Sequence, residues 1–104
     1  MIHLLYITVK DKEEARAIAA NLLEKGLIAC ANIVDGVESL YHWKGELCDV
    51  REVLLLAKTT EEKIPVVVDA VKAMHSYELP GIAAFPVTAG LPAFLRWVAG
   101  EVKK

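Results

Sequence analysis

The chain has 104 residues, of which 55% are apolar and 25% are charged. A chain of this length forms one domain and buries about two-thirds of its extended surface, so we expect a single domain over residues 1–104. Its core needs no disulfide or metal. No apolar run approaches the roughly 18 to 20 residues of a membrane span, which excludes an integral membrane protein, and the apolar content excludes a disordered chain.

Charge and cysteine content restrict the partners and the compartment. Twelve basic side chains face fourteen acidic ones, the net charge is −2, and the basic residues cluster only at Lys103 and Lys104, so no nucleic-acid partner is expected. The first residues lack both a charged region before the apolar run and a small-residue cleavage site after it. We therefore expect a cytoplasmic protein in which Cys30 and Cys48 are free thiols, although a disulfide between them stays open.

The first elements are a strand and a helix. Residues 2–9 form a short apolar run with the length of a largely buried strand. Asp11 stands three residues before Glu14, as in a helix cap, and Gly26 is suited to end the helix. Between them, one helical face is apolar at Ala15, Ile18, Ala19, Leu22 and Leu23.

A long hairpin follows. Residues 27–34 and 37–43 are compatible with one strand, interrupted by a bulge or kink at Asp35 and Gly36. Lys44 and Gly45 predict a two-residue turn, and residues 46–59 predict the returning strand.

The second half repeats the pattern with a helix, a strand and a further helix. Thr59 or Thr60 is expected to cap a helix with apolar positions at 67, 70, 71 and 74, while Pro65 predicts a late start or a distorted first turn. After a polar connector, residues 82–87 predict a strand that lies at a sheet edge or ends at Pro86. A last helix is expected to place on one face Leu91, Phe94, Leu95 and Val98.

The resulting order is βαββαβ with an added carboxyl-terminal helix. Two βαβ-like halves fold most simply as an antiparallel sheet with helices on one face. We therefore predict a ferredoxin-like α+β fold.

The hairpin is too long for a compact monomer. The stretch from residue 28 to residue 43 would reach about 50 Å, whereas a compact domain of this size is roughly 33 Å across. The hairpin must bend sharply at Asp35 and Gly36 or overhang. Because its distal end carries Leu40, Tyr41 and Trp43, an overhang predicts a neighbouring subunit that covers them. The alternative is a kinked hairpin that folds back on its own sheet.

Four separated segments carry a family resemblance: residues 27–32, 39–46, 53–59 and 75–80. In order and spacing they resemble the CutA divalent-cation-tolerance family. The resemblance implies a cytoplasmic, non-enzymatic, ferredoxin-like homotrimer, similar in architecture to the PII-type signalling proteins and linked to tolerance of copper and other divalent metals.

The same resemblance implies a copper site. The family's proposed ligands are a cysteine, which falls at Ile7 here, and a histidine pair, which falls at Met74 and His75, so His75 is the one imidazole retained. Met74 could bind Cu(I) through its thioether or pack in the core, which its helical spacing favours. No closely spaced ligand motif such as CxxC or HExxH is present. No cofactor is certain, and copper or another divalent metal could bind weakly or only in the assembled trimer.

The other candidates are polar residues expected to line clefts between subunits. Tyr77 and Glu78 follow His75 with a phenol and a carboxylate, although a histidine at a helix end can also be structural. Lys58 with Thr59 could hold an anion or form an ordinary helix start. Cys30 could be a ligand or a buried strand residue.

Three functions remain open at this stage. The first is a trimeric metal-tolerance or signalling protein that binds an ion or small ligand. The second is a small hydrolase resembling acylphosphatase, for which the loop after the first strand offers Lys10 and Lys12 in place of an arginine. The third is a purely structural trimeric scaffold.

Overall fold

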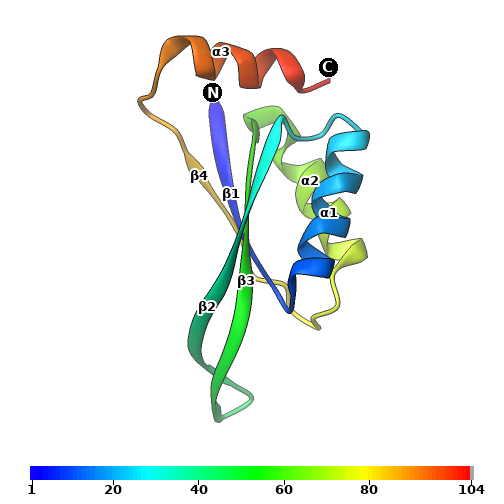
Figure 1. Cartoon of the computed structure of the whole chain (residues 1–104), viewed down its shortest axis with the longest axis vertical. Coiled ribbons are helices and arrows are strands. Elements are labelled where there is room, and N and C mark those ends of the chain that lie inside the picture. Colours follow the sequence, from blue (N-terminus) through cyan, green and yellow to red (C-terminus); the bar gives the residue numbers. More distant parts are fainter. Residues whose placement is uncertain (104) are drawn as a thin grey trace.

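The computed structural model describes residues 1–103 and forms two layers (Figure 1). The sheet contains four strands in the order β2-β3-β1-β4, and every neighbouring pair is antiparallel. This arrangement confirms the predicted ferredoxin-like α+β fold. Along the chain the elements are β1 (Ile2–Val9), α1 (Lys12–Glu24), β2 (Cys30–Trp43), β3 (Glu46–Thr60), a 3₁₀ turn (Glu61–Lys63), α2 (Ile64–Met74), β4 (Ile82–Pro86) and α3 (Pro92–Glu101).

The main core lies between the sheet and helices α1 and α2, which cover one face (Figure 1). Because strand side chains alternate between the two faces, every second residue of β1 and β3 points into this core. These residues are almost completely buried: Leu5, Ile7, Val9, Val53, Leu55 and Ala57. A second, smaller cluster forms where α3 packs its Val98 against Ile2 and Ala29.

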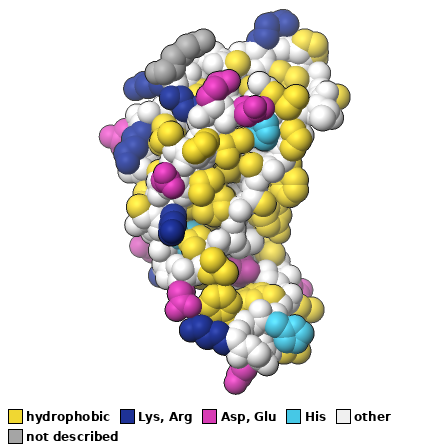
Figure 2. Space-filling model, turned by 180° about the vertical axis from the view of Figure 1, so that it is seen from behind, with side chains coloured by type: hydrophobic (Ala, Val, Ile, Leu, Met, Phe, Trp, Pro, Cys, Tyr) yellow, Lys and Arg dark blue, Asp and Glu magenta, His cyan; other side chains and the backbone are white. Residues whose placement is uncertain are grey.

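The opposite face of the sheet is apolar and only partly covered. Tyr6, Val34 and Phe85 are 39%, 44% and 51% exposed, and the Tyr6 and Phe85 rings meet edge to face at 6.5 Å. Seen from behind, hydrophobic side chains form a broad band down the molecule (Figure 2). An apolar face of this kind is typical of a surface that meets another protein.

Helix α1 begins and ends as the sequence predicts. The carboxylate of Asp11 accepts a hydrogen bond from the backbone N–H of Glu14 at 2.8 Å. At the other end Gly26 adopts a left-handed φ of +70°, and the N–H of Leu27 donates back to the carbonyl of Leu22 at 2.9 Å. Both signals are local, and the structure confirms both.

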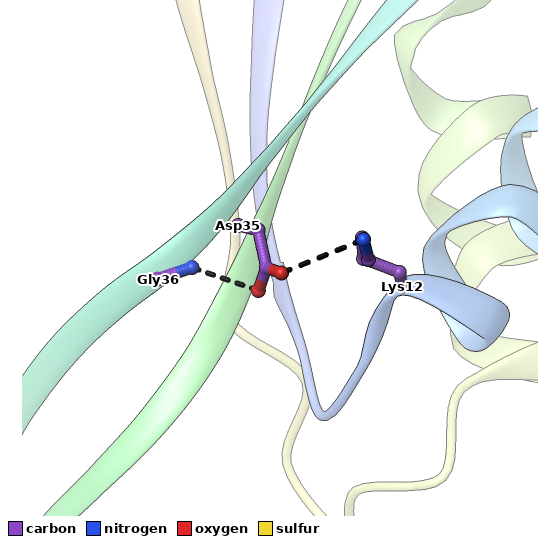
Figure 3. Close-up of polar contacts among 3 residues, drawn as sticks. All are labelled: Lys12, Asp35 and Gly36. Carbon is purple, nitrogen blue, oxygen red and sulfur yellow. Dashed lines mark hydrogen bonds and ion pairs between the residues drawn. The ribbon is translucent and has the colours of Figure 1, made fainter.

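The hairpin has the predicted bulge and turn. One extra residue in β2 shifts the register between Val34 and Val37. At the bulge the Asp35 carboxylate accepts a hydrogen bond from Gly36 N–H at 2.8 Å and lies 3.7 Å from Lys12 Nζ (Figure 3). The turn residues Lys44 and Gly45 both have positive φ, as a tight hairpin turn requires.

Of the two alternatives for the hairpin, the structure shows the overhang. The molecule measures 44 × 26 × 21 Å, and the distal hairpin extends past the ends of both α1 and α2 (Figure 1). At its tip Leu40 is 69% exposed and Tyr41 is 42% exposed, whereas Trp43 is partly buried.

The predicted caps for the second helix are wrong. Thr60 makes no side-chain cap bond, and Thr59 is fully buried and donates its hydroxyl to the carbonyl of Leu27 at 2.7 Å. The chain instead makes one 3₁₀ turn before α2, whose first turn holds Pro65, so the predicted late start is confirmed.

The last two elements confirm one prediction and correct another. Strand β4 pairs with β1 at the edge of the sheet and ends at Pro86, as predicted. In α3, Val98 is buried and Leu95 packs against the same cluster, but Leu91 and Phe94 are 70% and 42% exposed. Phe94 instead stacks on Trp97 on the outer side of the helix, with ring centroids 6.0 Å apart.

Candidate functional site

The segment that joins α2 to β4 is fixed by its first residue, His75. The Nε2 atom of His75 lies 2.7 Å from the carbonyl oxygen of Thr8, which can only accept, so Nε2 carries the proton. Its Nδ1 atom accepts a hydrogen bond from the backbone N–H of Tyr77 at 3.1 Å. Both ring nitrogens of the neutral imidazole are therefore in use, and Nδ1 can bind a metal only after Tyr77 N–H releases it.

Glu14 ties the same segment to the start of α1. One carboxylate oxygen accepts from Lys10 N–H at 3.2 Å and the other from Ser76 N–H at 2.9 Å. Burial opposes ionisation of Glu14, but the hydrogen bonds from Ser76 and Lys10 and the nearby His75 outweigh it and lower the pKa of this carboxyl below its ordinary value of 4.5. The ionised form of Glu14 is thus part of the folded structure.

Replacement of Glu14 with glutamine is expected to weaken the acid sensitivity of the fold. Because the folded-state pKa of Glu14 is lowered, its contribution to stability is present above pH 4.5 and is lost as the pH falls through the folded-state pKa. Urea unfolding at a series of pH values should show a smaller loss on acidification for Glu14→Gln than for the wild type. The exposed neighbour variant Glu13→Gln is the control, and parallel curves for all three proteins would contradict the assignment.

Tyr77 connects the segment to the central strand β3. Its hydroxyl donates to the carboxylate of Glu52 at 2.6 Å, and its ring packs on His75 with centroids 4.6 Å apart. Burial raises the pKa of Tyr77 most, and the hydrogen bond to Glu52 and the negative charge of that carboxylate raise it further. Tyr77 therefore stays a protonated donor across the physiological range, and Glu52 accepts its hydrogen bond.

These residues border an open cleft of about 660 Å³ between the hairpin and the segment 75–81. The end of β1 contributes Thr8 and Lys10 to its wall. The hairpin and the connecting segment contribute Tyr41, Trp43, Glu52, Tyr77, Glu78 and Leu79. At one side Lys44, in the hairpin turn, pairs with Glu78 at 3.4 Å, although both side chains are largely exposed and such a pair adds little stability.

The predicted cleft residues fall into two groups. Tyr77 and Glu78 line the cleft. Cys30 and Lys58 do not: they pair with each other across β2 and β3. Lys58 lies six residues along β3 from Glu52, which corresponds to about 20 Å between the two residues. Lys58 Nζ donates to the side-chain oxygen of Asn32 on the open face of the sheet. Because Thr59 is buried and bonded to Leu27, it is not free to hold an anion beside Lys58, and that interpretation is wrong.

The two cysteines and the first loop limit the chemistry further. Cys30 and Cys48 are free and partly buried, as expected. Next to the loop after β1, Glu14 of α1 accepts the Lys10 N–H and Asp35 of β2 pairs with Lys12. Carboxylates therefore border this loop where a phosphate-binding hydrolase would need an open cradle.

The residues of a single chain do not form a ready metal centre. Ile7 is fully buried in the core and Met74 packs against that core, which matches the packing interpretation of Met74. Within residues 1–103, no group of three or more histidine, cysteine, aspartate or glutamate side chains is placed to hold a metal ion. The retained imidazole of His75 is occupied by backbone groups.

Sequence reasoning missed Glu52 and the role of Glu14 beyond the helix. Glu52 is only 6% exposed although it is charged. The sequence holds a signal for Glu52: a carboxylate next to the apolar run 53–57 is hard to bury without a partner, so its position indicates a hydrogen-bonded site residue.

Among the helices of residues 1–103, none has the length and apolar content of a membrane span.

The four-stranded antiparallel sheet with two helices on one face and an overhanging hairpin defines a ferredoxin-like α+β domain. Residues 3–101 match the family model described as CutA1 divalent ion tolerance protein. The chain belongs to this family, as the resemblance predicted.

Relatives and solved structures agree over nearly the full length. The divalent-cation tolerance protein CutA of Thermus thermophilus is 44% identical over 98 residues, which cover 94% of this chain and 95% of that protein. The CutA protein of Archaeoglobus fulgidus is 45% identical over 103 residues, covering 99% and 100%. Solved structures from these two organisms, the second described as periplasmic, superpose with a TM-score of 0.95 at 42% and 44% identity and cover 99% of this chain and 100% of each structure.

Proposed function

We propose that this chain is a non-enzymatic protein of divalent metal tolerance that acts as a homotrimer and binds an ion or a small ligand in clefts between its subunits. Family membership over residues 3–101 supports the metal-tolerance part, because its relatives carry that function in their names. The trimer would resemble PII-type signalling proteins in architecture, and ligand binding would change the segment 75–81 that a partner protein could recognise.

The overhanging hairpin is the observation that carries the assembly. Leu40 and Tyr41 at its tip are too exposed and too apolar to favour a lone subunit in water. The partly covered face with Tyr6, Val34 and Phe85 offers a second apolar surface on the same subunit. Three copies could cover both kinds of surface, and closed symmetry would hide them in every subunit.

Copper, or another divalent metal, is proposed to bind only in the assembled protein. One imidazole with both nitrogens engaged is not a site, so other subunits would have to contribute ligands and Tyr77 N–H would have to release Nδ1 of His75. Such a site would bind more weakly than a preformed one. We expect it to serve metal homeostasis and not catalysis.

Calorimetric titration of the metal-free protein with Cu(II), Cu(I) and Zn(II) tests the metal part. The wild type should release or absorb heat with at least one metal, and His75→Ala should lose it. His3→Ala, which removes a histidine at the start of β1 outside the cleft, should keep it. If no metal produces heat in the wild type, the metal part is wrong. A scaffold without ligands would then be supported if the melting temperature also did not respond to metals or nucleotides.

The remaining proposals concern compartment and chemistry. The two free thiols favour a cytoplasmic protein, which cell fractionation tests directly. The net charge of −2 gives no support for a nucleic-acid partner. We expect no turnover of acyl phosphates, because the carboxylates of Glu14 on α1 and Asp35 on β2 border the loop that a hydrolase of this fold would need to bind phosphate.

A further inference from the structure

The wall of the cleft contains a buried carboxylate that lacks a cation. Glu52 is 94% buried, and the hydroxyl of Tyr77 donates to one of its oxygens at 2.6 Å. Within residues 1–103 the ion pairs are Lys12 with Asp35 and Lys44 with Glu78, so no cation lies within 4.0 Å of Glu52. Charged side chains are almost never buried without a partner, because removing a charge from water is costly.

Aromatic rings line the same cleft. Tyr77 contacts the carboxylate, whereas Tyr41 and Trp43 pair with β3 residues that lie four and six positions from Glu52. Tyr41, Trp43 and Tyr77 all line the cleft. The face of an aromatic ring attracts cations, and the Trp43 ring already does so, since Lys44 Nζ lies 5.6 Å from its centre. A buried carboxylate among aromatic rings is the combination that recognises an organic ammonium group.

The other charges of the cleft disfavour a bare metal ion. Lys10 and Arg51 also line it, and both also border a neighbouring hollow with Asp11 and Asp35. Both side chains repel any cation, but they repel a doubly charged metal ion more strongly than a singly charged ammonium group. A divalent metal also requires several oxygen ligands, whereas this wall offers a single buried carboxylate. An organic amine carries one charge and an apolar body, and that body can fill a cleft of 660 Å³, a size typical of small-molecule sites.

We propose that the cleft binds a small organic amine whose ammonium group pairs with Glu52 and whose apolar part packs against Tyr41 and Leu79. This inference rests on the proposed function, because it names the class of ligand that the cleft takes. The hydroxyl of Tyr77 holds the carboxylate in place, and the ammonium occupies the acceptor positions that Tyr77 leaves unused.

Calorimetry with matched probes tests the ligand class. The probes are 2-phenylethylamine, the neutral 2-phenylethanol and the anionic 3-phenylpropionate, in phosphate buffer because common buffers such as Tris are amines. The amine should bind at least tenfold more tightly than either of the other probes. Equal binding of amine and alcohol, or no binding of the amine, would overturn the proposal.

Variants test the residues. Glu52→Gln keeps an acceptor for the Tyr77 hydroxyl but removes the charge, so the affinity for the amine should fall to that of the alcohol, while Glu38→Gln on the exposed hairpin should change nothing. If Glu52→Gln does not fold, Tyr41→Leu serves instead and should weaken the amine several-fold while affecting the alcohol less. Unchanged amine affinity in a folded Glu52→Gln protein would refute the assignment.

The outcomes separate this inference from the proposed function. A trimer that binds metal but not the amine would remove the inference alone. A monomer that distinguishes the amine from the alcohol would support the inference and remove the proposed assembly.

Discussion

Replacing Leu40 with aspartate is expected to release single subunits from the assembled protein. The wild type should sediment at three times 11.4 kDa at micromolar concentration, and Leu40→Asp should shift the boundary toward 11.4 kDa. The reason is that Leu40 is 69% exposed in the lone subunit and would be buried in the trimer, where an unpaired carboxylate is costly. We expect the dissociation constant to rise by roughly a hundredfold or more, given about 1.5–3 kcal/mol for burying a leucine side chain.

Leu91 supplies a matched control, because it is 70% exposed but precedes α3, far along the chain from the hairpin. Leu91→Asp should leave the sedimentation unchanged and even provide α3 with the side-chain cap that it lacks. Equal dissociation of both variants would show that the hairpin has no special role in assembly. A wild type that already sediments at 11.4 kDa would remove the trimer altogether.

The second large effect is expected in the core. Leu55→Ala should lower the free energy of unfolding by about 2–5 kcal/mol, because Leu55 is fully buried beneath α1 and α2 in the central strand β3 and its loss leaves a cavity. Denaturant unfolding measures the change, and the loss should not depend on protein concentration.

Leu54, the preceding residue on β3, faces the other side of the sheet. Leu54→Ala is therefore the matched comparison for the loss of unfolding free energy in Leu55→Ala. It is partly exposed in the lone subunit, so Leu54→Ala should cost less than Leu55→Ala at low protein concentration. In a trimer that covers this face, the cost should grow as the protein concentration rises. A larger loss for Leu54→Ala than for Leu55→Ala at every concentration would contradict the assignment of the two faces.

Local signals made much of the fold predictable. Asp35 with Gly36 and Lys44 with Gly45 specify the bulge and the turn through the backbone angles that they favour. Asp11 begins α1 through its side-chain hydrogen bond to Glu14 N–H, and Gly26 ends the helix through its left-handed φ. Such residues act on their own neighbours in the chain, so they carry their structural meaning in any fold.

The predictions that failed depended on contacts far along the chain. Thr59 was expected to cap a helix, but the carbonyl of Leu27 lies close enough to take its hydroxyl. Phe94 shares helical spacing with Val98, but it stacks outward on Trp97 because α3 covers only one end of the sheet. Helical spacing shows which residues share a face but not how wide the contact with the sheet is.

The candidate site was predictable only in part. Tyr77 and Glu78 line the cleft because they follow each other in one segment, and that proximity is visible in the sequence. The connection from Tyr77 to Glu52 spans 25 residues and depends on how α2 packs on the sheet. The sequence alone therefore did not identify Glu52 as a site residue, although it is the most deeply buried carboxylate of the cleft.

The extra residue at Asp35 and Gly36 reverses the odd and even alternation of side chains along β2. Before it, the even-numbered residue Val34 pairs with Leu54, whereas beyond it the odd-numbered residues Tyr41 and Trp43 pair with even-numbered positions of β3. Deleting one residue there would give an uninterrupted ladder in which Tyr41 still pairs with Cys48 and Trp43 with Glu46. Both rings would therefore stay on the face of Glu52, while the local bend and extra twist of the ribbon would be lost. A single codon at this kink thus sets the direction in which the distal hairpin leaves the sheet, without changing which of its side chains share a face with Glu52.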